Sequence, residues 1–192
     1  MLSQVRPAIV ATVFFTLLLG VAYPLAITGV AALAFPFQAG GSLVRDGGKV
    51  VGSALIGQPF AAPRYLHGRP SAAGKGYDAS ASSGSNYGPL SPDLIAREKT
   101  DAQAIRDLGG AARPPADSVT TSGSGLDPDI SPAYARLQAA RIAAARGVSG
   151  DQVQAVINQF TQGPVLGFLG QPRVNVLMAN RALDRRFPPR RG

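Results

Sequence analysis

The sequence contains no cysteine and no tryptophan, a single histidine, and only 11 carboxylates among its 192 residues. Without cysteine the chain forms no disulfide and offers no thiolate ligand to a metal. Any Ser/His/acid triad would have to use His67, and no Gly-x-Ser-x-Gly motif is present to expose a nucleophile. The few His, Asp and Glu residues show no metal-ligand spacing. The sequence therefore offers very little for catalysis and no pattern that predicts a metal centre.

Two interpretations of His67 remain. In the first it is a loop histidine that is hydrogen-bonded to nearby backbone. In the second it is the acid-base residue of an anchored or secreted hydrolase. Acid-base catalysis needs an identifiable partner for the imidazole, and the sequence shows none, which favours the structural interpretation.

Charge is absent from a long N-terminal stretch. No charged residue and no histidine lies between Arg6 and Arg45, and residues 7–34 are apolar almost throughout. About 20 such residues cross the ~30 Å hydrocarbon layer as a helix, which also satisfies its own backbone amides. This pattern predicts one transmembrane helix, with a kink near Tyr23 because Pro24 lacks an N–H donor.

A cleaved secretory signal is the alternative, since Ala32-Leu33-Ala34 resembles a small-x-small cleavage site. The apolar region of a signal is normally ~7–15 residues long, and this one is nearly twice that, which favours a retained anchor. We therefore predict an anchor over residues 1–37, one soluble domain over residues 38–184 and a basic tail over residues 185–192.

The formal net charge is +8, but the basic residues form no stripe with interleaved aromatics. The densest cluster is in the tail and consists of Arg185, Arg186, Arg190 and Arg191. A solvated tail is the favoured interpretation, contact with anionic lipid headgroups is the alternative, and nucleic acid is not a predicted partner.

The soluble part has the pattern of an α+β domain with a small antiparallel hairpin followed by three to four helices. Asp46-Gly47-Gly48 is a typical tight-turn sequence between strands at 42–45 and 49–56. Residues 57–92 have no helical period, and we expect an ordered surface layer there. Helices are predicted at 92–108, with Gly109-Gly110 as its stop, at 131–147, at 149–163 with a Ser149/Gln152 capping box, and at 172–184.

The most polar motif is the loop at 120–128, which includes Thr121, Ser122, Gly123, Ser124 and Gly125. Successive Gly and Ser residues can turn their backbone N–H groups into one anion-binding concavity. No Walker lysine follows, so the chain is not a self-sufficient nucleotide hydrolase of that type. A tight structural turn before the Ser131 helix cap is favoured over an anion site.

Six blocks together resemble one family. They are Tyr23-Pro24, GQPF (57–60), HGRPSA (67–72), SGSNYGP (83–89), VTTSGSGLDPDISP (119–132) and PRVNVL (172–177). In this order they resemble the C subunit of the Kdp potassium-transporting ATPase, and the likeness spans nearly the whole chain.

The resemblance implies an accessory, non-catalytic subunit in the bacterial inner membrane. Its partners would be a potassium-selective channel-like subunit, a P-type ATPase subunit, a small single-span subunit and the lipid bilayer. No cofactor of its own is implied.

Two family mechanisms conflict. In one the subunit raises the nucleotide affinity of the ATPase subunit, with ATP contacted through residues 121–125. In the other the soluble domain lies on the outer face and covers the potassium entrance, where it cannot reach cytoplasmic ATP. The positive-inside rule does not decide between them, because each side of the span carries two positive charges: the α-amino group and Arg6 on one side, Arg45 and Lys49 on the other. We expect the outer face, with any effect on ATP affinity transmitted through the assembly.

Overall fold

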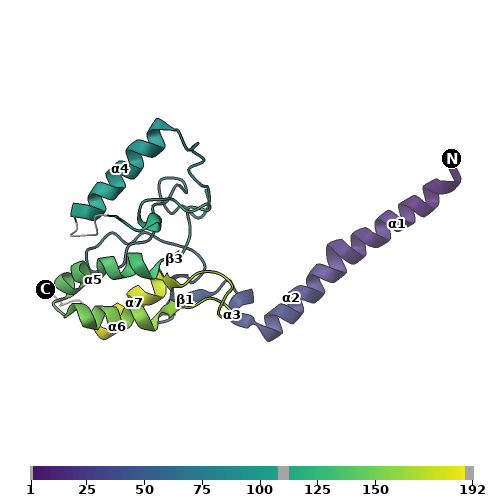
Figure 1. Ribbon diagram of the computed structural model, residues 1–192. Helices are drawn as coiled ribbons and strands as arrows, with labels where there is room; N and C mark the ends of the chain where they lie inside the picture. The colour runs from purple at the N-terminus through teal and green to yellow at the C-terminus, as the bar shows by residue number, and fades with distance from the viewer. Residues whose placement is uncertain (1, 108–112, 189–192) are drawn as a thin grey trace. The chain divides into compact units, whose positions relative to one another are not determined.

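The computed structural model describes residues 2–107 and 113–188 of the chain (Figure 1). It divides into two compact units, Met1–Val51 and Gly52–Gly192. The predicted helix stop at Gly109-Gly110 and the tail arginines Arg190 and Arg191 lie outside the described residues.

The first unit is dominated by one long helix. After a 3-10 turn at Leu2–Gln4, it consists of α1 (Val5–Leu17), a π-helical turn η2 (Leu18–Ala22) and α2 (Tyr23–Ala34). The whole of Val5–Ala34 is 30 residues long and buries none of its apolar window within the protein. Within the part of the chain that the structure describes, it is the one helix long and apolar enough to cross a membrane.

Pro24 is accommodated by the π-helical turn that precedes it. The N–H of Tyr23 donates to Leu18 O, five residues back, in place of the usual four. The Thr28 hydroxyl then donates to Pro24 O at 2.8 Å. Where the sequence predicts a kink, the structure has a π-helical turn, whose wider hydrogen bonding precedes the missing Pro24 donor.

A short helix α3 (Pro36–Ala39) leads to the hairpin of β1 (Leu43–Asp46) and β2 (Lys49–Ser53). Gly47 and Gly48 have φ values of 53° and 82°, which a residue with a Cβ adopts only with strain. The predicted hairpin is confirmed, although its second strand ends at Ser53 and not at Ile56.

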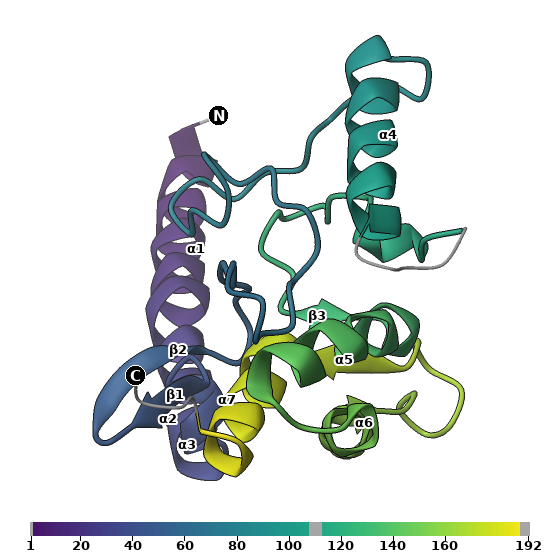
Figure 2. The ribbon, with the colours of Figure 1, turned by 90° about the vertical axis from the view of Figure 1, so that its left-hand side faces the viewer.

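The second unit packs helices against a three-stranded antiparallel sheet in the order β3-β5-β4 (Figure 2). Its elements are α4 (Pro92–Asp107), η3 (Ala116–Ser118), β3 (Asp129–Ile130), α5 (Pro132–Arg146), α6 (Gly150–Gln159), β4 (Thr161–Gln162), β5 (Arg173–Asn175) and α7 (Val176–Arg186). Val174 in the central strand faces Ile130 of β3 and Thr161 of β4. The α+β class is therefore confirmed, with a second sheet that the sequence does not predict.

Helix caps occur where the sequence places them. The Ser131 side chain accepts from the N–H of Tyr134, and Gly147 ends α5 in the left-handed conformation. Ser149 and Gln152 make the reciprocal hydrogen bonds of a capping box. The two N-caps, Ser131 and Ser149, satisfy amides that the first turn leaves unpaired, so these helix starts are fixed locally.

Two predicted helix boundaries are wrong. The helix predicted to end at residue 163 stops at Gln159, because Thr161 and Gln162 pair with β5. The helix predicted from residue 172 begins at Val176, because Arg173–Asn175 forms the central strand and the Asn175 side chain caps the helix by accepting from the N–H of Met178. Val174 is therefore a fully buried strand residue rather than part of a helical stripe.

The core of the second unit lies between α5, α6, α7 and the sheet. Its fully buried large side chains include Ile142, Val153, Val156, Ile157, Val174 and Leu183. Leu66 comes from the irregular segment at 57–91 and is also fully buried. Its N–H donates to Asn180 Oδ1 at 2.7 Å, and its carbonyl accepts from Asn180 Nδ2 at 2.9 Å. The predicted surface layer is thus ordered, but one of its residues belongs to the core.

Candidate functional site

The two polar loops that carry most of the resemblance blocks, residues 57–88 and 119–131, are joined by Arg69. One guanidinium nitrogen of Arg69 lies 3.0 Å from Asp127 Oδ2. The other donates to the carbonyls of Thr120 and Thr121, at 3.4 and 3.3 Å. The planar guanidinium group carries several N–H donors, so a single Arg69 side chain contacts one carboxylate and two carbonyls. Arg69 therefore fixes the shape of the 119–131 loop.

Ser71 and Tyr77 make a second connection between the loops. The Ser71 hydroxyl donates to Gly125 O at 2.6 Å and accepts from the N–H of Tyr77 at 2.8 Å. The Tyr77 hydroxyl donates to Arg69 O at 2.6 Å, and burial raises the pKa of Tyr77. The bond from the Tyr77 hydroxyl stabilises the loop that carries Arg69.

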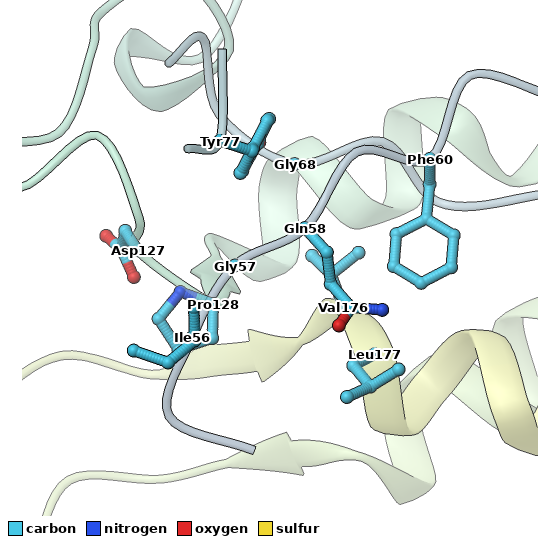
Figure 3. Close-up of a pocket in the computed structure, with 10 residues that line it drawn as sticks. All are labelled: Ile56, Gly57, Gln58, Phe60, Gly68, Tyr77, Asp127, Pro128, Val176 and Leu177. Carbon is cyan, nitrogen blue, oxygen red and sulfur yellow. The ribbon is translucent and has the colours of Figure 1, made fainter. Parts of the chain in front are cut away.

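Figure 3 shows one place where the two loops meet, around Tyr77, Asp127, Gly57 and Gly68. A Cβ on Gly57 would lie 2.6 Å from Asp127 O, and one on Gly68 would overlap the Tyr77 hydroxyl. The cavity between these residues measures about 10 Å³, room for one water molecule at most. This junction is a packed framework rather than a ligand site.

The five residues predicted as an anion-binding loop lie at the surface end of this framework. Ser122 is buried, and its carbonyl accepts from the N–H of Gly125 at 3.2 Å. The Thr121 hydroxyl donates to Ser85 Oγ at 3.2 Å. Gly123 and Ser124 are exposed, and no atom lies within 4 Å of a Cβ built on Gly123. The loop thus presents its tip to solvent.

The far side of the same loop packs tightly. The carbonyl of Ser124 accepts from the N–H of Ser83 and its hydroxyl accepts from the N–H of Leu126. Gly125 has φ of 66°, and a Cβ there would lie 2.6 Å from the N of Ala73 and 2.7 Å from Ser83 O. Glycine is required at this position by both the conformation and the close approach.

A carboxylate-lined groove of about 390 Å³ lies beside the framework. Asp129 Oδ2 lies 3.0 Å from Arg173 Nε, and Asp117 accepts from both the N–H and the hydroxyl of Ser131 at 2.6 and 2.8 Å. Burial raises the pKa of Asp129, against the lowering effects of Asn175 and Arg173. The groove is thus of mixed charge, and in the described residues no three His, Cys, Asp or Glu side chains gather as a metal site would need.

The structural interpretation of His67 agrees with its contacts. Its Nε2 lies 3.3 Å from Ala62 O, and its backbone N–H and carbonyl bond to Gln138 Oε1 and Nε2 at 2.8 and 3.1 Å. Burial, and secondarily the charge of Arg141, lowers the pKa of His67. The ring therefore faces a carbonyl, as expected of a loop histidine bonded to nearby backbone.

Arg69, Asp129 and Arg173 were not singled out by sequence reasoning, although all three fall inside the resemblance blocks. The one feature of the sequence that could have identified these residues is their location within the resemblance blocks, since no local pattern connects residues this far apart. Arg69 joins the two long loops, and Asp129 and Arg173 form an ion pair in the groove beside them.

Residues 5–185 match the family model KdpC, described as "K+-transporting ATPase, c chain". A potassium-transporting ATPase KdpC subunit of Caulobacter vibrioides (strain NA1000 / CB15N) is 68% identical over 190 residues, which cover 98% of this chain and 96% of the relative. The proteins of the same name from Beijerinckia indica and Rhodospirillum rubrum are 58% and 52% identical, covering 100% and 98% of this chain and 98% of each relative. A match of this extent and identity shows that the chain belongs to the KdpC family.

Proposed function

We propose that this chain is a non-catalytic subunit of a potassium-transporting ATPase complex in the bacterial inner membrane, required for assembly of the complex and for high-affinity uptake. The observation that carries the proposal is the family match over residues 5–185, which includes both the apolar span and the soluble unit. The relatives named above are subunits of such an ATPase, and this chain resembles them from end to end.

The membrane helix supports a role in assembly. Residues 5–34 are apolar, and none of the apolar window is covered by the rest of the chain, so its surface is free for lipid and for neighbouring helices. Gly20 and Gly29 have no atom within 4 Å of a built Cβ. Small residues permit close helix approach, which is how transmembrane helices associate in the absence of a hydrophobic driving force.

The proposed partners are a potassium-selective channel-like subunit, a P-type ATPase subunit and a small single-span subunit. We further propose that the soluble unit lies on the outer face, where it covers the potassium entrance, and that it modulates the ATPase subunit through the assembly. The Arg69 framework supports this role, because it orders two long loops into a fixed surface of the kind a partner recognises.

Deleting the chain tests the proposal. Membranes from cells that lack it should yield an incomplete complex and lose ATP-driven potassium uptake at low external potassium, and expression of the intact chain should restore both. Recovery of a complete complex with unchanged uptake from the deletion strain would refute the assignment.

A second candidate function is direct contact with ATP through residues 121–125. It is favoured by the exposed tip at Gly123 and Ser124, where open space leaves room for a ligand. The test is photocrosslinking of labelled ATP to the full chain within the complex, with Ser122→Ala and Gly123→Ala variants. Labelling that both variants retain would remove this loop as the site.

Topology separates the two candidates in one experiment. A reporter fused after Gly192 that is active only outside the cytoplasm places the soluble unit on the outer face and excludes contact with cytoplasmic ATP. Activity only in the cytoplasm would contradict the outer-face proposal and leave the ATP candidate standing.

A further inference from the structure

The turn between β4 and β5 exposes an apolar cluster that the proposed function does not explain. Val165, Leu166, Phe168 and Leu169 are 57%, 79%, 73% and 51% exposed. The described residues from Gly52 onward contain nine large hydrophobic side chains that are exposed, and these four fall within five positions. Scattered apolar side chains are common on protein surfaces, but a concentrated group usually marks an interaction site.

The turn is held in one shape by its own backbone. Val165 and Leu169 exchange two hydrogen bonds of 2.9 Å, and Gly167 and Phe168 donate to Pro164 O and Val165 O at 3.2 and 3.3 Å. These bonds close the turn without help from the core. In Figure 2 it appears as the yellow-green segment that stands out beyond β5 at the right of the view.

One residue of the turn adopts an unfavourable conformation. Leu166 has φ of 54°, a left-handed value that a leucine rarely adopts, and the glycines at 167 and 170 follow with φ of 82° and 86°. Such strain persists where the exposed arrangement of side chains is needed. The turn thus displays Leu166 and Phe168 at fixed positions although neither packs on the core.

The charges around the turn favour a protein partner over a lipid surface. No charged residue lies between Asp151 and Arg173 in a chain of net charge +8. Segments that insert at a membrane interface are typically flanked by Trp, Tyr, Lys or Arg. Residues 161–172 contain none of these, and the adjacent Arg173 is paired with Asp129 at 3.0 Å. Fluid lipid also requires no fixed side-chain arrangement, whereas a protein pocket does. An uncharged, rigid projection fits an uncharged, preformed pocket.

We propose that residues 164–169 form a docking projection that inserts into an uncharged apolar pocket of another subunit of the same pump. This inference rests on the proposed function and adds the contact surface to it. Four side chains fill the centre of an interface and not its whole extent, since a stable interface buries about 800 Å² on each partner. Leu166 and Phe168 are the most exposed of these four side chains and are the expected anchors of the interface.

The first test replaces Phe168 with the photocrosslinker p-benzoylphenylalanine in the full complex, in native membranes. The expected product joins this chain to one other subunit of the pump. Products with lipid only, or with a second copy of this chain only, would overturn the proposal in favour of those occupants.

The second test uses Leu166→Asn and Phe168→Ser. Asparagine tolerates the left-handed conformation of residue 166, so the first change removes the apolar side chain and keeps the turn. Leu90→Asn is the matched control, because Leu90 is 87% exposed in a different segment. Loss of an interface anchor should weaken retention of this chain in the complex at least about tenfold, and the control should not.

The readouts separate this proposal from the assignment to the pump. In detergent, the thermal midpoint of Phe168→Ser should equal that of the unchanged chain, because Phe168 lies outside the core. The midpoint of Leu166→Asn should be equal or higher, because asparagine also relieves the left-handed strain at residue 166. Unchanged retention of Leu166→Asn and Phe168→Ser would refute the docking projection. The deletion experiment would still report separately on whether the chain belongs to a potassium-transporting complex.

Discussion

Replacing Asn180 with leucine should destabilise the second unit, Gly52–Gly192, by about 3 kcal/mol. Asn180 is 1% exposed and bonds with both arms of its amide to the backbone of Leu66, which lies in the core without a strand partner. Leucine has nearly the same shape but can neither donate nor accept. The change therefore leaves one buried N–H and one buried carbonyl without their partner.

The magnitude follows from those two groups. Each unsatisfied buried backbone group costs about 1–3 kcal/mol, so the two together cost about 2–6 kcal/mol. The additional apolar surface of leucine offsets about 1–2 kcal/mol of this. The net loss of about 3 kcal/mol is a large share of the 5–15 kcal/mol that stabilises an ordinary domain.

The assay is urea denaturation of the full chain in detergent, followed by the near-ultraviolet circular dichroism of its five tyrosines, since it has no tryptophan. With a slope of about 2 kcal/mol per molar urea, the midpoint should fall by about 1.5 M. Asn158→Leu is the control, because Asn158 is an exposed helix residue. Equal midpoints for the two variants would show that the Asn180 contacts do not hold Leu66 in the core.

Three further predictions concern stability and use the same assay. Gly125→Ala should lower the free energy of unfolding by about 2 kcal/mol or more, because Gly125 has a positive φ and contacts the neighbouring loop. The control Gly123→Ala should change it by less than about 0.5 kcal/mol, and similar values for the two variants would contradict the tight packing of the loop. Arg146→Lys should lower the free energy of unfolding by about 2–4 kcal/mol, because the Arg146 side chain is 1% exposed and donates to Asp184 and to two carbonyls, and one ammonium group cannot reach all three. A midpoint equal to that of the unchanged chain would refute this role. Burial lowers the folded-state pKa of His67 below 6.5, so the unfolded chain binds more protons and stability should fall on acidification from about pH 7.5 to about pH 5.5. His67→Gln should reduce this loss, and an identical pH profile in both proteins would contradict the role of His67.

The elements predicted correctly are those whose signals are local. Pro132 follows the cap Ser131, the capping box spans Ser149 to Gln152, and Gly47-Gly48 fits one turn type. In each case the interacting groups are separated by a few residues. Their structure therefore depends little on the rest of the fold.

The elements that were missed have no such local signal. The strands β3 and β4 contain two residues each, too few to show alternation, and exist because Val174 lies between them. The prediction of a helix from residue 172 was wrong for the same reason. Apolar residues at 174, 177 and 178 fit a helical spacing, but pairing with two strands determined the conformation of the first.

The candidate site was predictable only in part. The sequence identified the polar loop at 121–125, and whether that loop contacts ATP stays a prediction. The Arg69–Asp127 pair joins residues 58 positions apart, so no spacing rule could connect them. The exposure of Leu166 and Phe168 could also not be predicted from the sequence, because an apolar run is more often part of the core.

Hydropathy and capping act over short stretches of chain, so the amino-acid sequence alone predicts the long apolar helix, the helix starts at Pro132 and Gly150, and the hairpin turn. Three features become visible only in the folded chain: Asn180 holds Leu66 across 114 residues, Arg69 connects two loops, and one apolar turn faces solvent. These features depend on contacts between distant segments. Their energies exist only once the chain has brought those segments together.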